Sequence, residues 1–164
     1  MRLLSALLVS GCAGPGVPCD VPPPADRFQC GSDFVVTPGL GEAAWSPLGD
    51  TLPLVRGPQG LQHVTLAFRL ELDPAALPVD RAMITVGAWR VSDGAEVAVE
   101  EAWGVGLVAD GDQVVVVDVR LVVPDPAPSL GSRVGVGVAF APVGSEREGS
   151  AWFEGKLAWA SGEP

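Results

Sequence analysis

The chain has 164 residues, of which 48% are hydrophobic and 18% are charged. This length fits one folded domain with its own core, and the large aliphatic content excludes an intrinsically disordered chain. Acidic residues outnumber basic residues by 20 to 10, and because the resulting formal charge of −10 repels phosphate groups, we expect no nucleic-acid partner.

The first twelve residues have the form of an export signal. Arg2 precedes an apolar stretch over residues 3–9, and small residues follow up to Cys12. A transmembrane helix needs about 20 apolar residues, so this segment is too short to span a membrane. We therefore predict that residues 1–11 are a cleaved signal peptide.

The residues around the expected cleavage point, Val9-Ser10-Gly11-Cys12, resemble the bacterial lipobox. In that family an aliphatic residue and two small residues precede a cysteine that receives a diacylglycerol, and the signal peptidase cuts just before it. The resemblance implies lipidation of Cys12 and therefore a membrane anchor. Because Ala13 follows instead of aspartate, it also implies a cell-envelope location at the outer membrane. An ordinary signal with a chance cysteine is the alternative.

Lipidation of Cys12 leaves a pair of cysteines, Cys19 and Cys30. In an exported chain such a pair indicates a disulfide bond. The alternative is a metal site, but zinc takes four nitrogen or sulfur ligands and only His63 could join the two thiols. Residues 12–30 are also rich in proline, so we predict a lipidated, extended tether with a disulfide, followed by a folded domain over residues 31–164.

The segments after Cys30 alternate between apolar and polar residues and are separated by Gly, Pro and Asp, which is typical of β-strands. The clearest strand covers residues 63–72, and its expected core face carries Val64, Leu66, Phe68, Leu70 and Leu72. The other predicted strands cover residues 33–37, 51–56, 83–91, 95–103, 105–109, 112–123, 133–141 and 151–159. Ser92-Asp93-Gly94 and Asp110-Gly111 indicate hairpin turns.

Alternation also predicts the core faces of the later strands. These inward residues are Val115, Val117, Val119, Leu121 and Val123, then Val134, Val136, Val138 and Phe140, then Phe153, Leu157 and Trp159. Proline-bearing loops at residues 73–78 and 124–128 are expected to carry the chain from one sheet to another. We predict an all-β fold, an antiparallel β-sandwich that is immunoglobulin-like in outline, with a β-barrel as the alternative.

Groups suited to catalysis are sparse. A serine hydrolase needs a nucleophile, a base and an acid, but the chain has one histidine and no Gly-x-Ser-x-Gly motif. The adjacent Glu100 and Glu101 point to opposite faces of a strand, so they do not form the paired acids of a glycosidase. We expect a non-enzymatic binding or structural module with no cofactor. A carboxylate-based hydrolase and calcium binding at a loop are the less favoured alternatives.

Two features are candidates for recognition of a carbohydrate or peptide. Trp152 falls on the polar face of its strand, beside Glu154 and Lys156, and is expected to be exposed. Gln59 and His63 lie in the segment Gly57-Pro-Gln-Gly-Leu-Gln-His63, which resembles a stretch in predicted lipoproteins of bacteria with large GC-rich genomes. That resemblance implies a turn between two strands of a β-sandwich and no activity. The expected partner is an envelope protein or a glycan.

Overall fold

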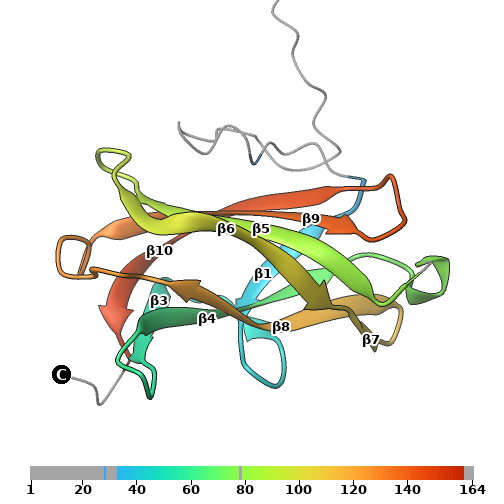
Figure 1. Ribbon diagram of the computed structural model, residues 1–164, viewed down its shortest axis with the longest axis horizontal. Helices are drawn as coiled ribbons and strands as arrows, with labels where there is room; N and C mark the ends of the chain where they lie inside the picture. Colours follow the sequence, from blue (N-terminus) through green and yellow to red (C-terminus); the bar gives the residue numbers. More distant parts are fainter. Residues whose placement is uncertain (1–27, 29–32, 78, 161–164) are drawn as a thin grey trace, which may run out of the picture.

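The computed structural model describes residue 28 and residues 33–77 and 79–160. Its strands form a single ten-stranded sheet that curls into two layers (Figure 1). The strands are β1 (Val36–Leu40), β2 (Ser46–Pro47), β3 (Thr51–Arg56), β4 (Gln62–Leu70), β5 (Arg81–Arg90), β6 (Glu96–Gly106), β7 (Val108–Asp110), β8 (Gln113–Val122), β9 (Arg133–Pro142) and β10 (Gly149–Trp159). A short 3-10 helix, η2 (Pro74–Ala76), begins at Asp73, whose carboxylate accepts the Ala75 N–H.

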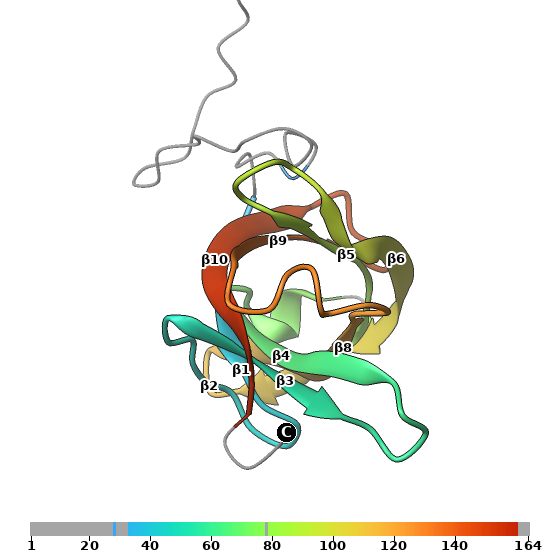
Figure 2. The same ribbon diagram turned by 90° about the vertical axis from the view of Figure 1, so that its left-hand side faces the viewer.

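The strands follow the order β2-β1-β4-β3-β10-β9-β5-β6, and β8 pairs with β4 and β7. Strands β5, β6 and β9 lie in one layer, β1, β3, β4 and β8 lie in the other, and β10 passes between them (Figure 1). Every pairing is antiparallel except that of β10 with β3, where Leu157 lies opposite Leu52. Viewed from one end, the sheet curls so that β6 and β8 lie on the same side (Figure 2).

The all-β class predicted from the sequence is confirmed. The immunoglobulin-like antiparallel sandwich is not confirmed, because the two layers belong to one continuous sheet that contains a parallel pair. The structure is better described as a curled, mixed sheet that forms a half-barrel. Among the described residues, no helix is long and apolar enough to cross a membrane.

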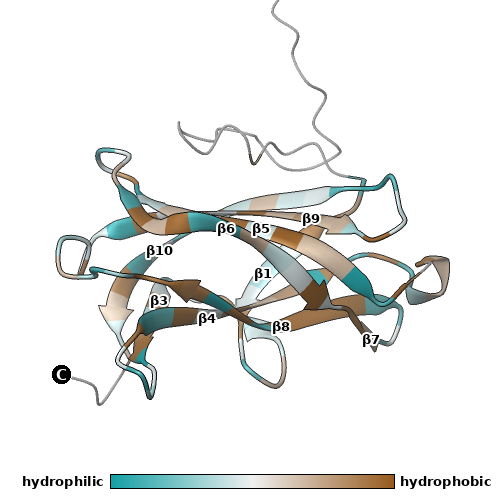
Figure 3. Ribbon diagram, in the orientation of Figure 1, coloured by the Kyte–Doolittle hydropathy of each residue, from teal (hydrophilic) through white to brown (hydrophobic). Residues whose placement is uncertain are grey.

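The core fills the space between the layers. Phe68 of β4 packs edge-on against Phe140 and Phe153, with ring centroids 5.2 Å and 6.2 Å away. The predicted core faces of β4 and β9 are confirmed, since their residues are almost completely buried: Val64, Leu66, Phe68, Leu70, Leu72, Val134, Val136, Val138 and Phe140. Hydrophobic residues run along β4 and β8, and hydrophilic residues mark several of the turns (Figure 3).

The predicted core face of β8 is wrong in its first half. Val114 and Val116, not Val115 and Val117, join the core there. The reason is a β-bulge near Asp118, which has a positive φ of 56° and shifts the register against β4 between Leu66 and Phe68. One extra residue exchanges the two faces of the strand, so a simple alternation fails across it.

The turns and crossovers follow the sequence expectation. Gly94 and Gly111 have positive φ values of 70° and 67°, as the tight turns before β6 and β8 require. Residues 71–80 lead from β4 to β5 and residues 123–132 lead from β8 to β9, so both proline-bearing loops connect the two layers (Figure 1). One difference is that the predicted strand at 95–103 continues as β6 to Gly106.

Candidate functional site

Trp152, the tryptophan expected to be exposed, is half-buried on the outer face of β10. Its ring stacks on that of Trp89 from β5, with ring centroids 6.1 Å apart and ring planes 22° apart. Trp89 is only 3% exposed, because the ring of Phe28 packs on its other side at 5.6 Å. The three rings form an aromatic cluster outside the main core, so Trp152 offers a ligand less surface than its strand position suggested.

Glycines beneath the aromatic cluster make room for it. A Cβ atom at Gly135 would lie 2.0 Å from the Trp152 ring, and one at Gly137 would lie 2.3 Å from the Phe28 ring. Because real Cβ atoms do not approach other atoms so closely, only glycine fits at either position. The space above Gly135 and Gly137, which we call the glycine trench, therefore holds the ring of Phe28 against the outer face of the sheet.

Gln59 and His63 belong to the hairpin between β3 and β4. Gln59 is exposed in the turn, whereas His63 is buried at 9% exposure, pairs with Val55 and Val122, and lies against Gly57. Trp152 pairs with Gly137 in the other layer. The structure therefore places Trp152 apart from Gln59 and His63. The predicted Cys12, Cys19 and Cys30 lie outside the described residues.

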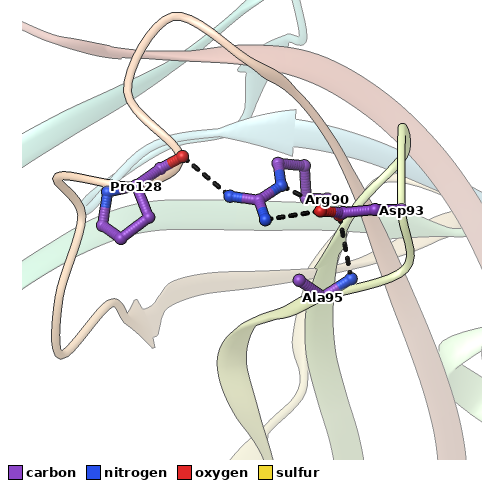
Figure 4. A network of polar contacts seen from close by, with 4 residues as sticks. All are labelled: Arg90, Asp93, Ala95 and Pro128. Atoms are coloured by element: carbon purple, nitrogen blue, oxygen red, sulfur yellow. Dashed lines mark hydrogen bonds and ion pairs between the residues drawn. The ribbon is translucent and has the colours of Figure 1, made fainter.

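Arg90 ties a turn to the crossover loop between β8 and β9 (Figure 4). Its guanidinium donates to Asp93 Oδ1 and Oδ2 over 2.9 Å and 2.6 Å, and to the carbonyl of Pro128 over 2.7 Å. The hydrogen bonds from Arg90, with a further one from the Ala95 N–H, hold the pKa of the Asp93 carboxyl below its usual value. The hydrogen bonds to Asp93 raise the pKa of Arg90.

Two further arginines also contact acidic or aromatic side chains. Arg120 pairs with Asp118 over 2.8 Å, and this hydrogen bond raises the pKa of Arg120. Arg69 lies over the Trp45 ring, 4.1 Å from its centroid, and approaches Asp110 at 3.6 Å. These contacts fasten the loop after β1 and the turn before β8 to the outer face of β4. Across the described part of the chain, no three His, Cys, Asp or Glu side chains gather as a metal ion would require.

The free edges of β6 and β8 lie on the same side of the curled sheet, and we call the region between them the seam. Among the described strands, β6 pairs with β5 alone, and β8 pairs with β4 along its length and with β7 at Gln113–Val115. A shallow depression lies in the seam (Figure 2 shows its two edges). Its lining residues are Val86, Val99, Glu101, Trp103, Arg120, Leu121, Val122 and Pro124.

Glu101 is the distinctive group in the seam. In the ladder it lies opposite Val86, a core residue, so the strand directs its side chain to the core-facing side. It remains exposed because the sheet is open there, and it makes no hydrogen bond or ion pair with any described residue. Trp103, opposite the core residue Ile84, packs beside it on the same face of β6.

Sequence reasoning identified Glu101 only as half of an adjacent acidic pair. The ladder places Glu101 opposite Val86 and Trp103 opposite Ile84, and the register shift that follows on β6 includes Glu100. The sequence could not show that β6 has no neighbouring strand among the described ones on its other edge, because that depends on how the whole sheet curls. A charged residue in phase with Val105 and Trp103 on one strand was the available signal.

Comparisons with known proteins place the chain in no family. No family model matches it, and no curated protein matches it. Among solved structures, a DUF4466 family protein from Parabacteroides merdae is similar over 73% of this chain, with 8% identity and a TM-score of 0.26. The chain spans 42% of the length of that protein.

Proposed function

We propose that the protein is an exported, lipid-anchored, non-enzymatic module that binds a partner in the cell envelope through the seam. The lipobox at residues 9–12 supports the anchor. The observation that carries the binding role is the pair of free strand edges in the seam, since unpaired backbone groups beside an apolar depression are what an extended partner requires.

The aromatic cluster supports a firm connection between anchor and domain. Phe28 is 2% exposed and packs in the glycine trench, so the proposed tether is attached to the sheet at a fixed point. At most about 3.5 Å per residue separates consecutive positions, so Cys12 and Phe28 are within about 55 Å of each other. The proposed location of the domain is therefore close to its membrane, at the outer membrane of the envelope.

Membrane fractionation of the host tests the anchor. The wild type and Ser10→Ala, which keeps a small residue in the lipobox, are expected in the membrane fraction. Cys12→Ser removes the acyl acceptor and is expected in the soluble fraction or as the uncleaved precursor. Equal distribution of the wild type and Cys12→Ser would contradict the proposed anchor.

Site-specific photo-crosslinking in the host tests the binding role. A photoreactive residue is placed at Val99 in the seam or at Leu61 in the hairpin between β3 and β4; both side chains are 55% exposed. We expect a discrete crosslinked product from position 99 and none from position 61. Identical crosslinking patterns from the two positions would contradict a partner at the seam. Recognition of a carbohydrate through Trp152 stays a prediction, as does the likeness to an immunoglobulin-like sandwich.

A further inference from the structure

The hydrogen-bond pattern shows which backbone N–H and C=O groups of β6 and β8 point into the seam. Leu107 donates its N–H to the carbonyl of Asp80 over 2.9 Å, continuing the ladder between β6 and β5. Hydrogen-bonded and free positions alternate in an antiparallel ladder. The N–H and C=O groups of Ala102 and Gly104 therefore point away from β5, to the free edge.

The same reasoning applies to β8. Val123 donates its N–H to the carbonyl of Gln62 over 2.8 Å, which continues the ladder between β8 and β4. The backbone groups of Val122 and Arg120 therefore point into the seam. The free edges of β6 and β8 therefore both carry backbone N–H and C=O groups that no strand pairing among the described residues satisfies.

The two strands that border the seam, β6 and β8, differ in net charge. Strand β6 carries three acids, Glu96, Glu100 and Glu101, and no base. On β8 the one acid and one base, Asp118 and Arg120, neutralise each other as an ion pair. Glu101 and Arg120 both line the depression in the seam, together with Trp103 and the exposed Val99. Because Asp118 already pairs with Arg120, Glu101 leaves one negative charge in the depression that no ion pair among the described residues neutralises.

We propose that the free edge of β6 binds an extended segment of a partner protein that is apolar on its core-facing side except for one basic residue, whose side chain lies between Glu101 and Trp103. This rests on the proposed function and names the partner's chemistry. The segment hydrogen-bonds to Ala102 and Gly104 as an added strand. Its base gains both a carboxylate and an aromatic face, which attract a cation together.

The charge of β6 selects this partner over a second copy of the chain. Pairing one β6 with another brings six glutamates together, and like charges across a strand pair are destabilising. A wholly apolar strand is also disfavoured, because it would bury Glu101 without a counter-charge. A strand with a single base beside Glu101 removes both costs.

Fluorescence anisotropy of a labelled nine-residue peptide of alternating valine and threonine, with its central valine replaced by lysine, tests the proposal, with the full chain purified from whichever cell fraction contains it. We expect saturable binding at about 0.15 M salt, and none of a peptide with glutamate in place of lysine. Glu101→Gln should raise the Kd at least about threefold. Glu146→Gln, which removes an exposed acid from the turn before β10, should leave it within about twofold.

A second pair of variants tests the strand pairing itself. Ala102→Pro removes an N–H from the free edge without touching the ladder to β5, and should raise the Kd about tenfold. Ala102→Ser keeps the N–H and should bind like the wild type. Circular dichroism and urea unfolding confirm that each variant is folded.

Several results would overturn the proposal. They are equal binding of the lysine and glutamate peptides, equal effects of Glu101→Gln and Glu146→Gln, an unchanged Kd in Ala102→Pro, or a homodimer in light scattering that Ala102→Pro dissociates. A chain that carries the lipid but does not bind the peptide would contradict this inference and leave the proposed anchor intact. A chain that binds the peptide but carries no lipid contradicts only the proposed anchor.

Discussion

Trp89 and Trp152 stack across the outer face of the sheet, with 6.1 Å between ring centroids, although β9 lies between their strands. The contact is possible because Gly135 of β9 has no side chain to separate the two rings. This arrangement makes the outer face a second, smaller packing centre. Its stability can be measured separately from that of the main core.

Gly135→Ala should destabilise the fold. The new Cβ atom would lie 2.0 Å from Cζ2 of Trp152, so the ring must move and lose its contact with Trp89. We expect a loss of about 1–3 kcal/mol in the free energy of unfolding, measured by urea denaturation. Gly104→Ala is the matched control, because a Cβ atom there meets nothing within 4 Å. Equal unfolding midpoints for the two variants would show that the trench does not hold the cluster.

Phe28→Ala should loosen the N-terminal attachment. The ring is 2% exposed and packs on Trp89, so its removal opens a gap and should lower the unfolding free energy by about 3 kcal/mol. The tryptophan emission should also shift to longer wavelength as Trp89 meets water. The control is Val35→Ala, at a side chain 51% exposed, which should cost less than about 0.5 kcal/mol. An unchanged emission spectrum for Phe28→Ala would contradict this packing.

Asp118→Val tests the bulge that exchanges the faces of β8. Asp118 has a φ of 56°, a conformation that aspartate and asparagine tolerate and β-branched residues do not. We expect Asp118→Val to lower the unfolding free energy by about 2 kcal/mol and Asp118→Asn to lower it by less than about 1 kcal/mol. The same loss in both variants would mean that the ion pair with Arg120, not the backbone, is what Asp118 supplies.

The pair formed by Arg90 and Asp93 should make stability depend on pH. The pKa of Asp93 is lowered from 3.8 in the folded state, so the ionised carboxylate stabilises the fold above that value, and its contribution is lost as the pH falls through the folded pKa. Wild type should therefore exceed Asp93→Asn in urea midpoint at pH 7, and the difference should disappear at lower pH. In an Arg90→Gln background, the pH-dependent difference that Asp93→Asn produces should shrink to the part that the Ala95 N–H supplies; an undiminished difference would show that Arg90 is not the main cause.

The local sequence pattern was sufficient to locate most of the strands. Alternation located β4 and β9 and their core faces, because the large apolar residues of each strand keep a period of two and the residues between them are polar or small. It failed on β8, because every residue from Val114 to Val117 is apolar and nothing in that run marks which one begins the bulge. Asp118, a polar residue within the apolar run, was the available sign.

The candidate sites depend on contacts between distant segments, which local pattern does not contain. Alternation placed Trp152 on the correct face of β10, but Trp89 and Phe28, which cover part of it, come from elsewhere in the chain. Glycines at positions 135 and 137, between the core valines of β9, are a sequence sign that large rings lie above. For the seam the sequence carried one sign, the charged Glu101 in phase with Trp103, but the seam itself exists only because the curled sheet stops short of closing.

Intact mass of the protein purified from its host is the most direct test of the anchored module. A chain that begins at Cys12, carries the added mass of acyl groups, and is two hydrogens lighter than its reduced form would support the anchor and the disulfide between Cys19 and Cys30 together. An unmodified chain with free thiols would contradict both, and the seam would then have to serve a protein that is not attached to a membrane.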